Sequence, residues 1–299
     1  MPQTLDLTAA TIDYEDTGGD GPVVLFVHGL LVNGTLWRKV VKPLDGFRCI
    51  VPTLPLGSHR TPARDRGALT PIGVADMLAE FMERLELTDV TIVANDTGGA
   101  ITQLLMVRRP ERIARVVFTP CDAFENFLPP AFRPMQWAAK ARLLAPTLLL
   151  AHIRALRPTP LAYGVLTKTR VPDEVLESWV RPALSSRAVR GDVQHFTRHI
   201  DKRLTLDAAT KLGAFDRPVL FAWASEDRFF KIAFAERLAA VFPDARVEPI
   251  ADARTFVSED QPDVLARLIA EFASGSDDNR ARDASGRGRR EHADSLRNV

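Results

Sequence analysis

A carboxylate at a tight turn is the most informative chemical feature of this sequence. Asp96 stands between an aliphatic run at 90–94 and the small residues Thr97, Gly98 and Gly99, after which the chain reads as a helix. A sharp strand-to-helix turn needs small neighbours, because its central residue is held in a strained conformation that lifts its side chain above the sheet. A carboxylate in that position can act as a nucleophile or a base. An ordinary turn without chemistry is the alternative.

A second feature, His28-Gly29, follows another aliphatic run at 23–27. Backbone N–H groups after such a turn can face the same site and hold a developing oxyanion. The residue after the glycine is Leu30, and we expect its N–H group and that of Thr97 to be the two donors. We also expect His28 to lie where it can touch a substrate.

These residues need a sheet to position them. Continuous aliphatic runs suit strands that are buried on both faces, and they lie at 23–27, 49–51, 90–94, 113–118, 219–223 and 247–250. Helix patterns lie between them, at 71–87, 98–109, 230–242 and 259–272. Strands that alternate with helices predict an α/β fold with a doubly wound, mostly parallel sheet.

Two segments depart from this rhythm. Residues 122–206 contain Pro-rich turns and helical patterns but no convincing strand, which predicts a helical cap inserted over one end of the sheet. The core is then formed by residues 1–121 and 207–273. From residue 274 the chain is rich in Arg, acids, Gly and Ser, so we expect 274–299 to be a disordered tail.

At Asp96 and His28-Gly29 the chain resembles the α/β-hydrolase superfamily, above all the haloalkane dehalogenase and epoxide hydrolase group, whose nucleophile is an Asp at this turn. The resemblance covers residues 5–273, including the cap-like insertion. It implies an α/β-hydrolase fold and a hydrolase that acts on a small organic substrate.

In this group the acid of the catalytic triad follows one of two strands, either the strand after the turn's helix or the next strand beyond the cap. Both places hold a carboxylate here, Asp122 and Asp227, and Asp227 is the better match. Either one could instead cap a helix, because an Asp at a strand-to-helix junction satisfies free N–H groups without chemistry.

The catalytic histidine of the group is missing. Thr255 stands where this His is expected and Arg254 where a Gly is expected. A neutral Thr cannot activate water near pH 7, so the ordinary release of an ester from Asp96 is in doubt. His59, in a loop after a strand, is the best substitute base, although a loop His bonded to backbone or solvent is the alternative.

The absence of certain residues narrows the range of substrates that the resemblance allows. Dehalogenases of this group hold the halide with an Asn or a Trp in the places that Leu30 and Thr97 fill here, and epoxide hydrolases use two cap tyrosines. Tyr14 and Tyr163 are the only tyrosines, so neither activity fits well. In the insertion, Phe124 and Trp137 are expected to line an apolar pocket, with plain core packing as the alternative.

Composition excludes other functions. Lys and Arg number 39 against 38 Asp and Glu, so the net charge of +1 gives no general attraction to nucleic acid or to an anionic membrane. Cys49 and Cys121 are the only cysteines, which argues against a disulfide scaffold. His195 and His199 have the spacing of a zinc pair, but no third ligand is evident. Without a signal sequence, we expect a cytoplasmic protein.

The sequence therefore predicts an enzyme of α/β-hydrolase fold with an incomplete triad and no cofactor, acting on a small, apolar organic molecule. Asp96 is its nucleophile or base, Asp227 or Asp122 orients the site, and His59 is the candidate for proton transfer. The alternative is a binding protein that keeps the fold and has lost the triad. The oligomeric state stays open.

Overall fold

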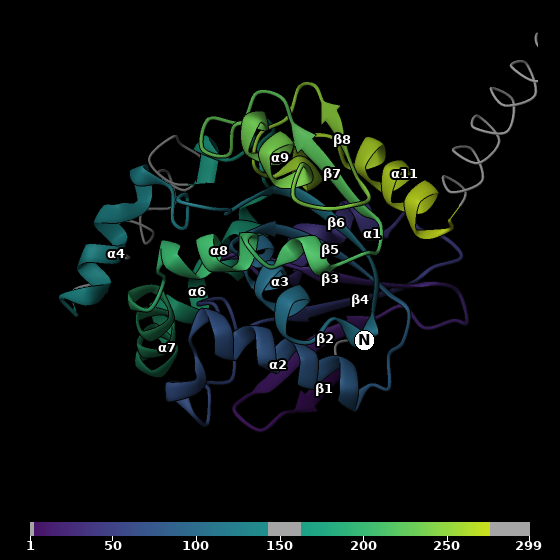
Figure 1. Ribbon diagram of the computed structural model, residues 1–299. Helices are drawn as coiled ribbons and strands as arrows, with labels where there is room; N and C mark the ends of the chain where they lie inside the picture. The colour runs from purple at the N-terminus through teal and green to yellow at the C-terminus, as the bar shows by residue number, and fades with distance from the viewer. Residues whose placement is uncertain (1–2, 143–162, 276–299) are drawn as a thin grey trace, which may run out of the picture.

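The computed structural model describes residues 3–142 and 163–275, and its centre is one sheet of eight strands (Figure 1). The order is β1-β2-β4-β3-β5-β6-β7-β8, with β1 and β2 antiparallel at one edge and the other strands parallel. The predicted α/β class and mostly parallel sheet are thus confirmed. The strands are β1 (Gln3–Asp6), β2 (Thr11–Asp16), β3 (Val23–Val27), β4 (Arg48–Thr53), β5 (Val90–Asp96), β6 (Ile113–Cys121), β7 (Val219–Ala224) and β8 (Ala245–Ile250).

Helices follow the strands as the sequence pattern indicated. The α-helices are α1 (Arg38–Val41), α2 (Pro71–Arg84), α3 (Thr97–Arg108), α4 (Arg133–Lys140), α6 (Asp173–Ser185), α7 (Arg187–Arg198), α8 (Lys202–Ala209), α9 (Ile232–Ala239), α10 (Val257–Asp260) and α11 (Pro262–Ala273). The last predicted helix is divided, because the residue before Pro262 is driven out of the helical conformation.

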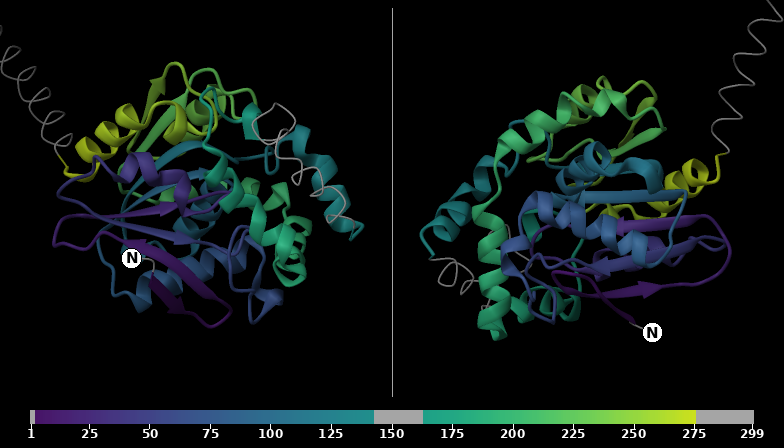
Figure 2. Two further views of the ribbon diagram at one scale, coloured as in Figure 1. Left: turned by 180° about the vertical axis from the view of Figure 1, so that it is seen from behind. Right: turned by 60° about the horizontal axis from the view of Figure 1, so that its bottom comes forward.

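The two faces of the sheet bury two apolar clusters. Along β3, Leu25 and Val27 join one cluster with α2, α3, α8 and α9, whereas Val24 and Phe26 join the other with α1 and α11. This alternation follows from the pleat of a strand, which sends successive side chains to opposite faces. Seen from behind, α11 and α1 cover the face opposite to α2 and α3 (Figure 2). The covered faces leave the strand ends as the place for chemistry.

The described parts of the predicted insertion, 122–206, hold helices α4, α6 and α7 (Figures 1 and 2). Helices α6 and α7 contact the loops that leave β3 and β4, and α4 packs on α7. Asn33 donates a hydrogen bond to Ser178 of α6, and Ser58 donates one to the Trp179 carbonyl. The predicted boundary at 207 falls inside α8, which packs on α3. Residues 143–162 of the insertion and most of the predicted tail, from 276, lie outside the described residues.

Candidate active site

Asp96 lies at a sharp turn between β5 and α3. Its φ of 53° and ψ of −131° are unusual for a residue with a side chain. Small neighbours make this turn possible: a Cβ on Gly98 would lie 2.6 Å from the carbonyl oxygens of Val27 and His28, and one on Gly99 would meet Cys121 at 2.3 Å. The two glycines therefore let α3 start close against β3 and β6, and the strained residue between strand and helix is the carboxylate.

A backbone N–H group holds the Asp96 carboxylate. The Leu30 N–H donates to Asp96 Oδ2 across 3.3 Å, and the neighbouring Thr97 N–H favours the charged form of this carboxyl and so lowers its pKa. Gly29 permits the close approach, since a Cβ there would stand 2.2 Å from Asp96 Oδ2. Of the two donors expected from the sequence, Leu30 hydrogen-bonds the Asp96 side chain, whereas Thr97 acts on its charge without a side-chain hydrogen bond.

The charge of Asp96 is finely balanced. Burial raises the pKa of Asp96 to about 6, the N–H groups of Thr97 and Leu30 oppose that rise, and the nearby Asp227 carboxylate adds to it. A pKa near 6 leaves most of the carboxylate ionised at neutral pH and therefore able to attack a carbon atom.

Asp122 follows β6 directly beside Asp96, and its N–H donates to the Asp96 carbonyl at 3.3 Å. Its side chain is fully buried, and Oδ2 accepts a hydrogen bond from the Thr97 hydroxyl at 3.1 Å. Oδ1 has no hydrogen-bond partner among the described residues. Burial, and then the charge of Asp96, raise the pKa of Asp122 well above its ordinary value. Asp122 is therefore harder to ionise than an ordinary aspartic acid.

Asp227, which follows β7, accepts hydrogen bonds at both of its carboxylate oxygens. Oδ1 accepts from the N–H groups of Phe229 and Phe230, each at 2.7 Å, and Oδ2 accepts from the Thr255 hydroxyl at 2.7 Å. Burial raises the pKa of Asp227, and these donors limit the rise. Thr255 is itself buried, and Asn95 donates to its carbonyl at 2.7 Å. Thr255 therefore contacts the predicted acid but supplies no base.

The structure does not bring His59 to Asp96. His59 Nε2 pairs with Asp192 Oδ2 on α7 at 3.2 Å, and Nδ1 accepts from the Gly57 N–H at 3.3 Å. Asp192 is fully buried and also accepts from the Ala63 N–H and from Arg66 Nε. Both ring nitrogens of His59 are thus engaged in joining a loop to α7. Asp192 was not predictable as a partner of His59, because nothing in the spacing of the sequence relates α7 to this loop.

His28 is fully buried and has no free nitrogen for a substrate. Its Nε2 accepts from the Leu54 N–H and its Nδ1 contacts the Gly29 carbonyl, each at 2.8 Å. Burial lowers the pKa of His28 to about 4, so the ring is neutral at pH 7. The substrate contact expected of His28 is therefore not what this geometry provides, because both polar atoms of the ring face the backbone.

The two aromatic residues expected at the pocket differ in exposure. Trp137 on α4 is 64% exposed. Phe124 is buried, and the Arg237 guanidinium covers its ring at 3.7 Å from the centroid. Trp137 therefore faces solvent, whereas Phe124 is packed under an arginine.

The loop that carries Thr255 is tied to residues 163–171. Asp260 accepts hydrogen bonds from the Thr167 hydroxyl and from the N–H groups of Lys168 and Thr169, and Arg254 donates to the Thr167 carbonyl. The Arg254 side chain thus donates its hydrogen bonds to backbone carbonyls within residues 163–171.

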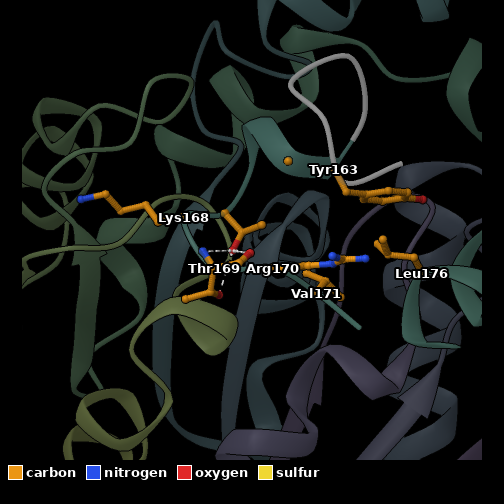
Figure 3. Close-up of a pocket in the computed structure, with 8 residues that line it drawn as sticks. Tyr163, Lys168, Thr169, Arg170, Val171 and Leu176 are labelled. Carbon is orange, nitrogen blue, oxygen red and sulfur yellow. Dashed lines mark hydrogen bonds between the residues drawn. The ribbon is translucent and has the colours of Figure 1, made fainter. Parts of the chain in front are cut away.

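Two cavities border the described helices, and neither has Asp96 in its lining. One, of about 500 Å³, lies between α6 and the loop of Ser58 and Arg60. The other, of about 430 Å³, lies against residues 163–171 (Figure 3). The lining of this second cavity is Tyr163, Gly164, Thr167, Lys168, Thr169, Arg170, Val171 and Leu176.

No group of three or more metal-ligating side chains gathers within residues 3–142 and 163–275. His195 and His199 stack with ring centroids 4.3 Å apart, and His199 Nδ1 contacts the His195 carbonyl. Over the same ranges no helix is long and apolar enough to cross a bilayer.

Comparison with known proteins identifies the family to which the fold belongs. The family model described as alpha/beta hydrolase fold matches residues 22–262. The chain belongs to this family. Haloalkane dehalogenase 2 of Mycobacterium tuberculosis is 28% identical over 292 residues, covering 89% of this chain and 92% of the relative. The cis-3-alkyl-4-alkyloxetan-2-one decarboxylase of Xanthomonas campestris is 29% identical over 290 residues, covering 91% and 95%.

Solved structures show the same fold. Haloalkane dehalogenase DbeA from Bradyrhizobium elkani superposes with a TM-score of 0.76 at 21% identity, over 92% of this chain and 98% of that chain. The protein is thus an α/β-hydrolase-fold protein related in sequence to haloalkane dehalogenases and to alkyloxetanone decarboxylases.

Proposed function

We propose that the protein is an enzyme in which the Asp96 carboxylate attacks a carbon atom of a small, apolar organic substrate and forms an ester. The observation that carries this proposal is a carboxylate held at a strained turn, with the Leu30 N–H on one of its oxygens. One oxygen, Oδ2, is held by Leu30, so the other is the candidate attacking atom. The small-molecule substrates named for the two relatives support the substrate class.

The neighbouring acids have supporting roles in this proposal. Asp227 keeps a negative charge near Asp96 and so raises its pKa, while Asp122 beside it resists ionisation because of burial and the charge of Asp96. Leu30 and Thr97 stabilise the charge that develops on the ester if water attacks it. Thr255 cannot take a proton from that water, so an ester formed from a haloalkane should persist on Asp96.

Mass spectrometry of the intact protein tests this proposal. Wild type and Asp96→Asn are incubated with small haloalkanes, haloacids, epoxides, activated esters and oxetan-2-ones. We expect a mass increase that occurs in wild type and is lost in Asp96→Asn. It corresponds to the transferred alkyl or acyl group for haloalkanes, haloacids and esters, and to the whole ring-opened molecule for epoxides and oxetan-2-ones. Absence of both adduct and turnover across the panel would overturn the nucleophile proposal and favour a binding protein that has lost the triad.

The missing base favours a second, more specific candidate: decarboxylation of an oxetan-2-one, the substrate class in the name of the Xanthomonas relative. In the first step Asp96 attacks the alkyl-bearing ring carbon that is bonded to the ring oxygen, not the carbonyl carbon. The bond between that carbon and the ring oxygen breaks and gives a free carboxylate. In the second step the bond to this carboxylate breaks and releases CO₂. Its electron pair forms the alkene while the bond to Asp96 breaks and regenerates the aspartate.

Neither step consumes water or needs a general base, which is why this reaction suits a site with Thr255 in place of the histidine. Gas chromatography of the alkene formed from a cis-3,4-dialkyl oxetan-2-one tests it. We expect multiple turnovers in wild type and none in Asp96→Asn. A stable adduct without alkene would rule out this candidate and leave the ester-forming proposal standing.

A further inference from the structure

We propose that His28 is a positioning residue, which aims the Leu30 N–H at Asp96 by holding the carbonyl of the peptide that joins Gly29 to Leu30. The inference rests on the proposed function, in which Asp96 is the reacting group. It gives His28 a role through the backbone, without contact with a substrate.

The hydrogen bonds of His28 fix its tautomer. The Leu54 N–H donates to Nε2 at 2.8 Å, so Nε2 must be the unprotonated nitrogen of the neutral ring. The hydrogen then resides on Nδ1, which lies 2.8 Å from the Gly29 carbonyl oxygen and donates to it. One ring thus links the end of β4 to the turn after β3.

Peptide geometry carries this constraint to Asp96. The bond between Gly29 and Leu30 is trans, and in a planar trans peptide the C=O and the N–H point in opposite directions. When His28 holds the Gly29 carbonyl on one side, the Leu30 N–H must point to the other, where Asp96 Oδ2 lies at 3.3 Å. The absence of a Cβ on Gly29 leaves room for this approach.

Burial keeps the arrangement constant over the pH range in which Asp96 titrates. The pKa of His28 is lowered to about 4, first by burial and also by the charge of His59, whereas the pKa of Asp96 is about 6. The ring therefore stays neutral while Asp96 changes charge. The other titratable groups that interact with the charge of Asp96 are Cys121, Asp122 and Asp227.

Two amide variants separate the two hydrogen bonds of His28. The amide nitrogen of Asn is attached to Cγ, as Nδ1 is, so His28→Asn can still donate to the Gly29 carbonyl. The amide of Gln is attached to Cδ, at the level of Nε2, so His28→Gln can still accept from Leu54 but leaves Gly29 without its donor. Both variants are polar and fill part of the same buried space.

The test is a carbon-13 NMR titration of the Asp96 carboxyl in the full chain, with its signal assigned by Asp96→Asn. A hydrogen bond to the charged form lowers a carboxyl pKa, so its loss raises that pKa. We expect His28→Gln to raise the pKa of Asp96 by about one unit. We expect His28→Asn, and His195→Leu as a distant control, to leave it within a few tenths of a unit.

An equal pKa of Asp96 in the two amide variants and the wild type, all with native circular dichroism, would overturn the inference. So would a shift confined to His28→Asn. A loss of fold alone could not produce the expected contrast, because both variants are measured as folded proteins. The titration needs no substrate, so it also distinguishes this inference from the proposed function, which the adduct experiment tests separately.

Discussion

The hydroxyl of Thr255 donates a hydrogen bond to Asp227 Oδ2 across 2.7 Å. This contact occupies Oδ2, while Oδ1 is held by two backbone N–H groups. The acid is therefore completely satisfied, and the group facing it has no lone pair basic enough to deprotonate water. Thr255 and Asp227 therefore form a buried hydrogen bond, but Thr255 cannot accept a proton from water as a histidine could.

Thr255→His should restore the missing base. With Asp227 already in place to orient an imidazole, we expect the release of an ester on Asp96 to accelerate by about 10² or more. Decay of the adduct mass after removal of free substrate measures this rate. Thr255→Val is the control, because it removes the hydroxyl without adding a base. Equal ester lifetimes in the His and Val variants would contradict our placement of the missing base at position 255.

Adduct formation should depend on pH through Asp96. Only the ionised carboxylate attacks, so the single-turnover rate should rise with pH, with a midpoint of about 6, and then level off. Asp227→Asn should lower this midpoint, because the Asp227 charge raises the pKa of Asp96. Quenched-flow samples analysed by mass give the rates. A rate that stays constant between pH 5 and pH 8, a range chosen to span a midpoint of about 6, would argue against Asp96 as the ionising nucleophile.

Asp96→Asn should stabilise the fold at neutral pH. The pKa of Asp96 is raised in the native state to about 6, so its contribution to stability is present below about pH 4 and is lost as the pH rises through 6. An amide carries no such cost. We expect a gain of about 1–3 kcal/mol at pH 7.5 and almost none at about pH 4, measured by urea unfolding. An equal gain at both pH values would mean that strain, not charge, is relieved.

Asp192→Asn should loosen α7 from the loop of His59. Although burial opposes it, hydrogen bonds from His59, Arg66 and Ala63 lower the pKa of Asp192, so its contribution is present at neutral pH and is lost in acid. We expect a destabilisation of about 3 kcal/mol at pH 7, because removing one partner leaves buried groups unpaired.

Urea unfolding measures the Asp192 effect, and hydrogen exchange in α7 locates it. Asp207→Asn is the matched control, since its pair with Lys211 is exposed and should change stability by less than about 1 kcal/mol. If the two variants lose similar free energies of unfolding, the buried contacts of Asp192 stabilise the fold no more than the exposed pair of Asp207 and Lys211 does.

The parallel core was predictable because its strands are buried on both faces and therefore read as continuous aliphatic runs. The edge strands β1 and β2 were missed. In β2 the buried residues Ile12 and Tyr14 alternate with more exposed polar ones, a weaker signal that a search for continuous runs overlooks.

The site was predictable where chemistry follows local sequence. Asp96, Leu30 and Thr97 lie within or beside turns whose glycines mark them, and the structure brings them together. The partner of His59 was not predictable, because Asp192 lies 133 residues away on a helix whose docking depends on tertiary packing. Sequence spacing carries no information about such a contact.

The donor at position 30 is a main-chain N–H, and its direction is set by the peptide before it. The side chain at this position can therefore change without removing the hydrogen bond to Asp96. Because Leu30 is buried in the core, its side chain is constrained by packing, while the hydrogen bond to Asp96 depends on the main chain alone.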